Sequence, residues 1–251
     1  MQQSYYGEIY ASTYDIGGDR PDILSLYLGR WEKAGRPEPV LDAMCGTGYF
    51  LSAFLEAGAD VDGVDASEPM LRQCGMKVAG GSSTLYHQRL EEIDLPRRYG
   101  FIVIPDRSFS HLYEKEVAAE GLRRFYDQLS PGGTLVLDIR QPPRAGEFGE
   151  KGDSSVWLDE RIEGSAVFCT GLWGRRDEGR VIRHTVKQEK FVGDELVETE
   201  IFDYNERFFD RDEFQAMLVD AGFVNIEASK AYEAGEIEMH DGLVFSGERP
   251  L

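Results

Sequence analysis

The chain reads LDAMCGTG over residues 41–48 and VDGVDASEPML over residues 61–71. In each stretch an apolar run predicts a buried strand. Gly46 and Gly48 predict a sharp turn after the first strand, and Asp65 ends the second. A doubly wound α/β sheet holds adenosine ligands with such a glycine turn and an acid about 20 residues further on. The two stretches therefore predict a site for an adenosine-containing cofactor.

The glycine spacing argues against a nicotinamide dinucleotide. The fingerprint for that ligand is GxGxxG, and its third glycine allows the helix and strand to pack closely under the pyrophosphate. Counting from Gly46, Gly48 stands at the second position, but Leu51 stands at the third. We therefore expect a different adenosine-containing ligand.

The first half of the chain alternates strand and helix patterns. Apolar runs predict strands over 40–43, 61–65, 84–88, 101–105 and 134–139. Helices are predicted between them, one starting at Ser67 and one running over 118–129, and residues 130–133 (SPGG) predict a turn. Strands joined by crossover helices form a parallel sheet.

Residues 141–207 interrupt this alternation with segments of period two, and Gly193 with Asp194 predicts a hairpin turn between two of them. A helix around 214–221 and strands over 224–228 and 242–247 follow. We predict an α/β fold: a doubly wound seven-stranded mostly parallel sheet with an antiparallel β insertion after strand 5. Residues 1–140 and 208–251 would form the cofactor-binding domain with an N-terminal helical lid, and 141–207 an acceptor or dimer surface.

Composition narrows the class of partner. The 251 residues carry a formal net charge of −19, which argues against long nucleic acids and anionic membranes as partners. Three widely spaced cysteines without a CxxC pair indicate a reducing cytoplasm, and no segment has the roughly 18 apolar residues of a membrane span. The scattered histidines lack the spacing of a metal site.

Four motifs together resemble the class I S-adenosylmethionine-dependent methyltransferases: VLDAMCGTG, VDGVDASEPML, the LSPGG turn and the late DAGF segment. The resemblance covers roughly residues 10–139 and 207–247. It implies a Rossmann-like methyltransferase fold, an enzyme, and S-adenosyl-L-methionine as cofactor. One position departs from the family, because Met44 replaces the first glycine of the usual GxGxG.

The resemblance implies a set of cofactor contacts. Asp42, Gly46 and Gly48 fall on the motif around the methionine end, Asp65 on the acid that holds the ribose, and Leu90 and Glu91 where the adenine is flanked. Arg20 is a candidate partner for the cofactor carboxylate, with a solvated surface arginine as the equal alternative. The full predicted set is Asp42, Ala43, Met44, Gly46, Gly48, Asp65, Ala66, Met70, Leu90, Glu91 and Arg20.

The segment after the fourth strand, IPDRSFSHL at 104–112, concerns the acceptor. It lacks the Asn/Asp-Pro-Pro-aromatic motif of amino-modifying nucleic-acid methyltransferases. SFSHL instead resembles small-molecule methyltransferases, particularly the N,N-dimethyltransferases of nucleotide-linked amino sugars and, more loosely, glycine N-methyltransferases. That resemblance implies that His111 lies beside the acceptor amine and that Tyr14 closes over the sulfonium.

Methyl transfer to an amine gives these residues a chemical meaning. The reaction is an in-line displacement, and the attacking amine must be unprotonated. An imidazole with a pKa near neutrality can take its proton, so His111 is the candidate base, with a loop histidine bound to backbone as the alternative. Tyr14 is a candidate lid residue, and packing of the N-terminal tyrosines on the core is its alternative.

The acceptor pocket is the least specified part of the prediction. Its candidates are Tyr6, Trp157, Tyr204 and Arg207, although aromatic residues on a sheet also serve packing or a dimer contact, and a homodimer through the insertion stays open. We expect methyl transfer from S-adenosylmethionine to an amine of a small molecule. The alternatives are O- or C-methylation, and cofactor binding without methyl transfer.

Overall fold

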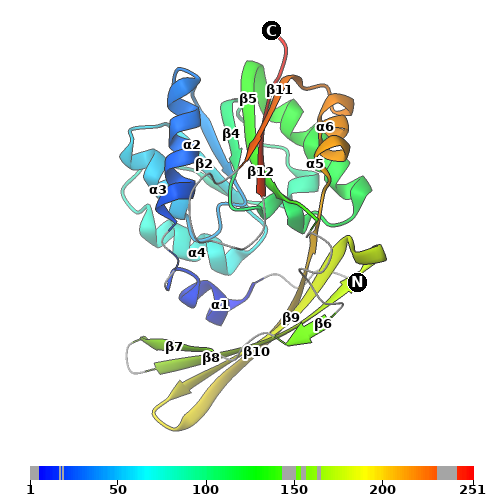
Figure 1. The fold of residues 1–251 in the computed structure, drawn as a ribbon. Coiled ribbons are helices and arrows are strands. Elements are labelled where there is room, and N and C mark those ends of the chain that lie inside the picture. The colour runs from blue at the N-terminus through cyan, green and yellow to red at the C-terminus, as the bar shows by residue number, and fades with distance from the viewer. Residues whose placement is uncertain are drawn as a thin grey trace.

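The computed structural model describes residues 6–142 apart from 17 and 19, and 151–153, 157–162, 165–230 and 242–251, with the side chains of 151, 153 and 157–162 left aside. Figure 1 shows two layers of structure: a sheet flanked by helices, and below it a long, curved antiparallel sheet. The short helix α1, Glu8–Thr13, lies between them (Figure 1).

The larger sheet has seven strands in the order β11-β12-β5-β4-β1-β2-β3. Its strands are β1 Val40–Ala43, β2 Val61–Asp65, β3 Leu85–His87, β4 Tyr99–Ile104, β5 Leu129–Arg140, β11 Val224–Lys230 and β12 Gly242–Glu248. β1 to β5 pair in parallel, and β12 runs antiparallel to both β5 and β11. The strand order reverses between β1 and β4, and such a switch point opens a crevice at the carboxyl ends of the strands. The predicted fold class is confirmed.

Helices cover both faces of this sheet (Figure 1). One face carries α2 Pro21–Lys33, α3 Tyr49–Glu56 and α4 Glu68–Lys77, and the other carries α5 Lys115–Gln128 and α6 Arg211–Asp220. Buried apolar side chains form one cluster on each face, with Trp31 and Phe54 on the first and Phe125 and Phe214 on the second. The continuous apolar runs of β1 and β4 are buried throughout, as expected for strands covered on both faces.

Local sequence explains where α4 begins. Ser67 has extended backbone angles, and its Oγ accepts a hydrogen bond from the Met70 amide at 3.3 Å. Pro69 occupies the first turn, where it has no amide hydrogen to leave unsatisfied. The predicted helix start at Ser67 is therefore confirmed.

The predicted turn at residues 130–133 lies inside β5. Gly132 adopts φ +78°, but its amide donates to the Arg249 carbonyl at 2.9 Å, and the Arg249 amide donates to the Gly133 carbonyl at 2.9 Å. The chain after β12 thus supplies partners for this backbone. Residues 130–133 fall within the bounds of β5 but form an irregularity in it: Leu129 pairs with Tyr99 and Thr134 pairs with Phe101, so the SPGG segment has no partner in β4.

The second sheet is built from β6 Lys151–Asp153, β7 Trp157–Ile162, β8 Ser165–Arg176, β9 Val181–Val192 and β10 Glu195–Arg207. The order is β10-β9-β8-β6, with β7 also paired to β8, and every pair is antiparallel. Gly193, at φ +60°, stands in the tight turn between β9 and β10, which confirms the predicted hairpin. In the described part of the chain, no helix has the length and apolar character needed to cross a membrane.

The N-terminal segment is bound on one side by β10 of the second sheet and on the other by α4, which packs on the larger sheet. The Glu200 carboxylate on β10 accepts hydrogen bonds from the amides of Gly7 at 2.6 Å and Ile9 at 3.0 Å, at the start of α1. On the other side, the Ser67 hydroxyl donates to the Tyr6 carbonyl at 2.8 Å, and Glu8 forms an ion pair with Arg72 of α4. These contacts place α1 across the carboxyl edge of the larger sheet.

Candidate active site

The turn after β1 has three residues in the left-handed region: Met44 at φ +61°, Gly46 at φ +54° and Gly48 at φ +84°. A Cβ on Gly48 would lie 2.6 Å from the Cys74 sulfur, so the glycine permits close packing of α4. A Cβ on Gly46 would meet no atom within 4 Å. Met44, the residue that departs from the family pattern, takes a conformation that favours glycine.

Asp65 connects this turn to β2. Its two carboxylate oxygens accept from the amides of Gly46 at 2.9 Å and Ser67 at 2.8 Å. Burial raises the pKa of Asp65, and these amide hydrogen bonds oppose the rise. Since each oxygen has only one of these donors, the carboxylate keeps acceptor capacity toward the crevice.

Asp42 contributes a second carboxyl group at the end of β1. The side chain is fully buried, and among the described residues neither carboxyl oxygen has a well-formed hydrogen-bond partner. Burial raises its pKa well above the usual range, Cys74 and Asp65 nearby raise it further, and a hydrogen bond with the Leu51 backbone opposes the rise. A buried polar group without a partner is costly unless a ligand satisfies it.

The other predicted cofactor residues surround the same edge. Ala43 ends β1 and is buried, and Met70 lies buried in the first turn of α4. The Ala66 carbonyl contacts Nε2 of His87 at 2.9 Å. Beyond β3, the short helix η1, Leu90–Glu92, buries Leu90.

Two charged residues at this edge have partners within the protein. Glu91 forms an ion pair with Arg89. The Arg20 guanidinium lies 3.1 Å from the Asp106 carboxylate, just after β4, and 5.6 Å from the centre of the Tyr14 ring. Burial raises the pKa of Tyr14 although Arg20 opposes the rise, so its hydroxyl stays protonated. Arg20 and Tyr14 therefore meet beside the end of β4.

His111 ends the short helix η2, Ser108–His111, and faces the second sheet. Its ring centroid is 5.5 Å from that of Tyr204 and 6.3 Å from that of Tyr6. Nδ1 lies 3.3 Å from the Asn205 carbonyl oxygen. Because a carbonyl only accepts, we assign the proton to Nδ1, which leaves Nε2 unprotonated. Burial lowers the pKa of His111, and Glu206 opposes that shift.

Only some of the remaining acceptor candidates lie beside His111. Tyr6 and Tyr204 do, and Tyr6 also stacks on Tyr10 with centroids 4.4 Å apart. Arg207 turns toward η3, Asp177–Gly179, where it pairs with Asp177 at 2.9 Å. Trp157 begins β7, but its side chain is outside the described part of the structure.

Comparison with known proteins identifies the family of the domain that carries this site. Residues 40–133, from β1 through the glycine turn to the first part of β5, match the model of the methyltransferase domain family. The chain carries a class I S-adenosylmethionine-dependent methyltransferase domain. The predicted enzyme class and cofactor are confirmed.

Three known proteins similar to this methyltransferase cover most of its length. The putative methyltransferase YqeM of Bacillus subtilis is 28% identical over 77% of this chain and 77% of its own. The dTDP-3-amino-3,4,6-trideoxy-alpha-D-glucopyranose N,N-dimethyltransferase of Streptomyces venezuelae is 27% identical over 73% of this chain and 81% of its own. Among solved structures, the sugar N-methyltransferase KedS8 from Streptoalloteichus superposes with a TM-score of 0.78 at 22% identity, covering 100% of this chain and 96% of that one.

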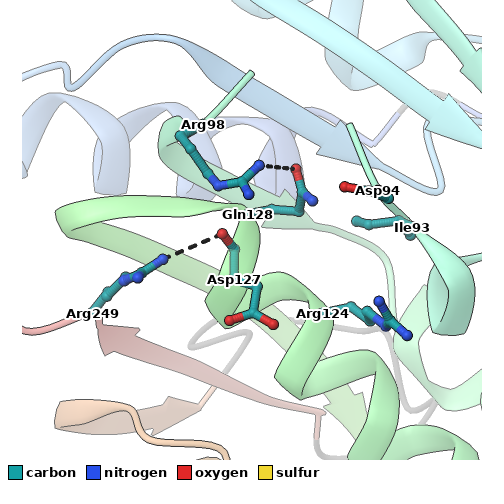
Figure 2. Close-up of a pocket in the computed structure, with 7 residues that line it drawn as sticks. All are labelled: Ile93, Asp94, Arg98, Arg124, Asp127, Gln128 and Arg249. Carbon is teal, nitrogen blue, oxygen red and sulfur yellow. Dashed lines mark hydrogen bonds between the residues drawn. The ribbon is translucent and has the colours of Figure 1, made fainter. Parts of the chain in front are cut away.

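A separate pocket of the methyltransferase lies at the opposite edge of the larger sheet (Figure 2). The pocket lies at the amino ends of β4 and β5. Asp65 lies at the carboxyl end of β2, which runs parallel to them, and so at the other edge of the sheet. Arg249 Nη1 donates to the Tyr126, Asp127 and Leu129 carbonyls at 3.1, 3.3 and 2.8 Å, and so caps the end of α5. This pocket is not part of the methyltransferase site.

Sequence reasoning missed four residues around His111: Arg140, His184, Asn205 and Glu206. Strand alternation offered one signal, since Glu206 stands two positions after Tyr204 and therefore shares its face of β10. Asn205 lies between them on β10, whereas Arg140 and His184 come from β5 and β9. In the described ranges, no group of three or more His, Cys, Asp or Glu side chains has metal-binding geometry.

Proposed function

We propose that this methyltransferase moves a methyl group from S-adenosylmethionine to the amine nitrogen of a small molecule, with His111 accepting the amine proton. The observation that carries the proposal is the contact between His111 Nδ1 and the Asn205 carbonyl, because it leaves Nε2 free as a base. The similarity to sugar N-methyltransferases supports an amine acceptor.

The cofactor supplies, when bound, a methyl group on a positively charged sulfur. We assign its ribose hydroxyls to Asp65 and its adenine to the region of Leu90 and Glu91. The buried carboxyl of Asp42 and the open space at Gly46 support placing the methionine end of such a ligand at this turn. Tyr14 would lie over this end, with Arg20 beside it.

The chain's own residues orient the acceptor and remove its proton. As the nitrogen–carbon bond forms and the sulfur–carbon bond breaks, an N–H proton passes to Nε2 of His111. The rings of Tyr6 and Tyr204 pack against His111, and Tyr10 and Phe202 pack behind Tyr6, which supports a site with little water. Alignment in a dry site supplies most of the rate enhancement for such a displacement.

Two further proposals concern the partners. The outer face of the second sheet exposes Phe168, Leu172 and Ile201, which supports a homodimer through residues 141–207. The net charge of −19 supports small molecules rather than nucleic acids or membranes as partners. Cytoplasmic residence is supported by Cys45, Cys74 and Cys169, none of which forms a disulfide.

The test of the base is the variant His111→Gln, assayed for methyl transfer to amines. We expect the rate to fall by about 100-fold or more, in the range that general bases contribute. Calorimetry should show unchanged affinity for S-adenosylmethionine, which establishes that the cofactor site is intact. An unchanged rate would remove His111 from the reaction.

A further inference from the structure

A buried ion cluster lies behind His111. Glu206 on β10 is only 8% exposed, yet its carboxylate forms an ion pair with Arg140 Nη1 at 2.9 Å. The same oxygen, Oε2, lies 3.1 Å from Nε2 of His184 on β9. Although burial favours the neutral acid, Arg140 and His184 hold the pKa of Glu206 down at about 2. The carboxylate is therefore charged at every pH at which an amine can react.

Three contacts connect this cluster to His111. The His184 ring stacks on Tyr204 with centroids 4.4 Å apart, and the Tyr204 ring also makes an edge contact with the His111 ring. The Asn205 carbonyl, between Tyr204 and Glu206 in the chain, contacts Nδ1 of His111. The Arg140 amide donates to the hydroxyl of Ser110 at 3.2 Å, next to His111 in η2. Strands β5, β9 and β10 thus meet around the imidazole.

A structural role alone does not explain a buried ion pair at this place. Moving two charges out of water costs several kcal/mol each, and an apolar pair of similar volume often stabilises a protein as well or better. The charges that face His111 have opposite effects on its pKa: Glu206 raises it, whereas Arg140 and His184 lower it. Tyr6 and Tyr204 add neutral hydroxyls, because burial raises their pKa values.

We propose that Glu206 is a positioning residue for methyl transfer, whose buried carboxylate, fixed by Arg140 and His184, stabilises the imidazolium that forms when His111 takes the amine proton. This inference rests on the proposed function, in which His111 is the base. It adds a charged group that does not itself contact the acceptor. Its action depends on charge, so changes of charge at the cluster must move the pKa of His111 in a defined direction.

The test is a histidine titration by NMR on the free protein, with the His111 resonance assigned by its loss in His111→Gln. Glu206→Gln should lower the pKa of His111, because the variant lacks the negative charge that favours the protonated imidazole. Arg140→Gln should raise it. The double variant removes both charges, which avoids an unpaired buried ion, and should give an intermediate value.

The same variants provide a kinetic readout. Glu206→Gln should move the acid limb of the pH profile of kcat/KM to lower pH by the same amount and reduce its plateau, and Glu206→Asp, which keeps the charge, should restore the position of the limb. An unchanged His111 titration in either Glu206→Gln or Arg140→Gln would overturn the inference. That result is distinct from failure of the proposed function, which appears as full activity in His111→Gln.

Discussion

Replacement of Gly48 by alanine tests the packing beneath the glycine turn. The residue has φ +84°, and a side chain in the left-handed region costs about 1–2 kcal/mol. The added Cβ would also lie 2.6 Å from the sulfur of Cys74, which is fully buried and has little room to move. Overpacking of this kind costs about 1–3 kcal/mol. We therefore expect Gly48→Ala to lower the free energy of unfolding by about 3 kcal/mol.

The neighbouring glycine is the matched control. Gly46 also has positive φ, at +54°, but a Cβ there would meet nothing within 4 Å, so Gly46→Ala should cost only the strain, about 1 kcal/mol. In a Cys74→Ala background, where the sulfur is absent, the cost of Gly48→Ala should fall to a similar value. Urea unfolding of the four variants measures these differences. Equal costs at Gly46 and Gly48 in the wild-type background would refute the close packing.

Three other substitutions test separate parts of the structure. Burial raises the pKa of Asp138 to about 6, so the free energy of unfolding falls by up to about 3 kcal/mol as the pH rises from about 4 to 6 and the carboxyl ionises. In Asp138→Asn, which cannot ionise, urea unfolding should show that this fall is absent. Asp65→Asn should weaken S-adenosylmethionine binding at least about tenfold by calorimetry, and equal affinity would contradict the ribose assignment. Glu200→Gln should speed amide hydrogen exchange over residues 7–13, whereas unaltered exchange there would show that the Gly7 and Ile9 bonds do not hold α1.

Local patterns predicted the cofactor half of the molecule well. β1 and β2 have the bounds that their apolar runs indicated, and Ser67 caps α4 as its residue type predicts. The resemblance also marked Met44 as unusual, and the structure places it in the left-handed region that favours glycine. These features depend on interactions between residues close in the chain or on one recurring motif.

Features that depend on distant contacts were not predictable. The SPGG segment stays within the bounds of β5 as an irregularity, and its glycines pair with Arg249 from the far end of the chain. The carbonyl that orients His111 belongs to Asn205, 94 residues away, and no local pattern relates the two. Arg20 pairs with Asp106, although nothing near Arg20 in sequence indicates that partner. Each of these contacts joins segments that are far apart in the chain, so it follows only from the three-dimensional fold.

The most direct test of the account locates the transferred methyl group. The protein would be incubated with S-adenosylmethionine carrying an isotopically labelled methyl and with small-molecule amines, together with matched alcohols and carbon acids, and the product examined by NMR. The account predicts label on nitrogen, at a rate that falls by about 100-fold or more in His111→Gln. Label only on oxygen or carbon, or cofactor binding without any transfer, would contradict it.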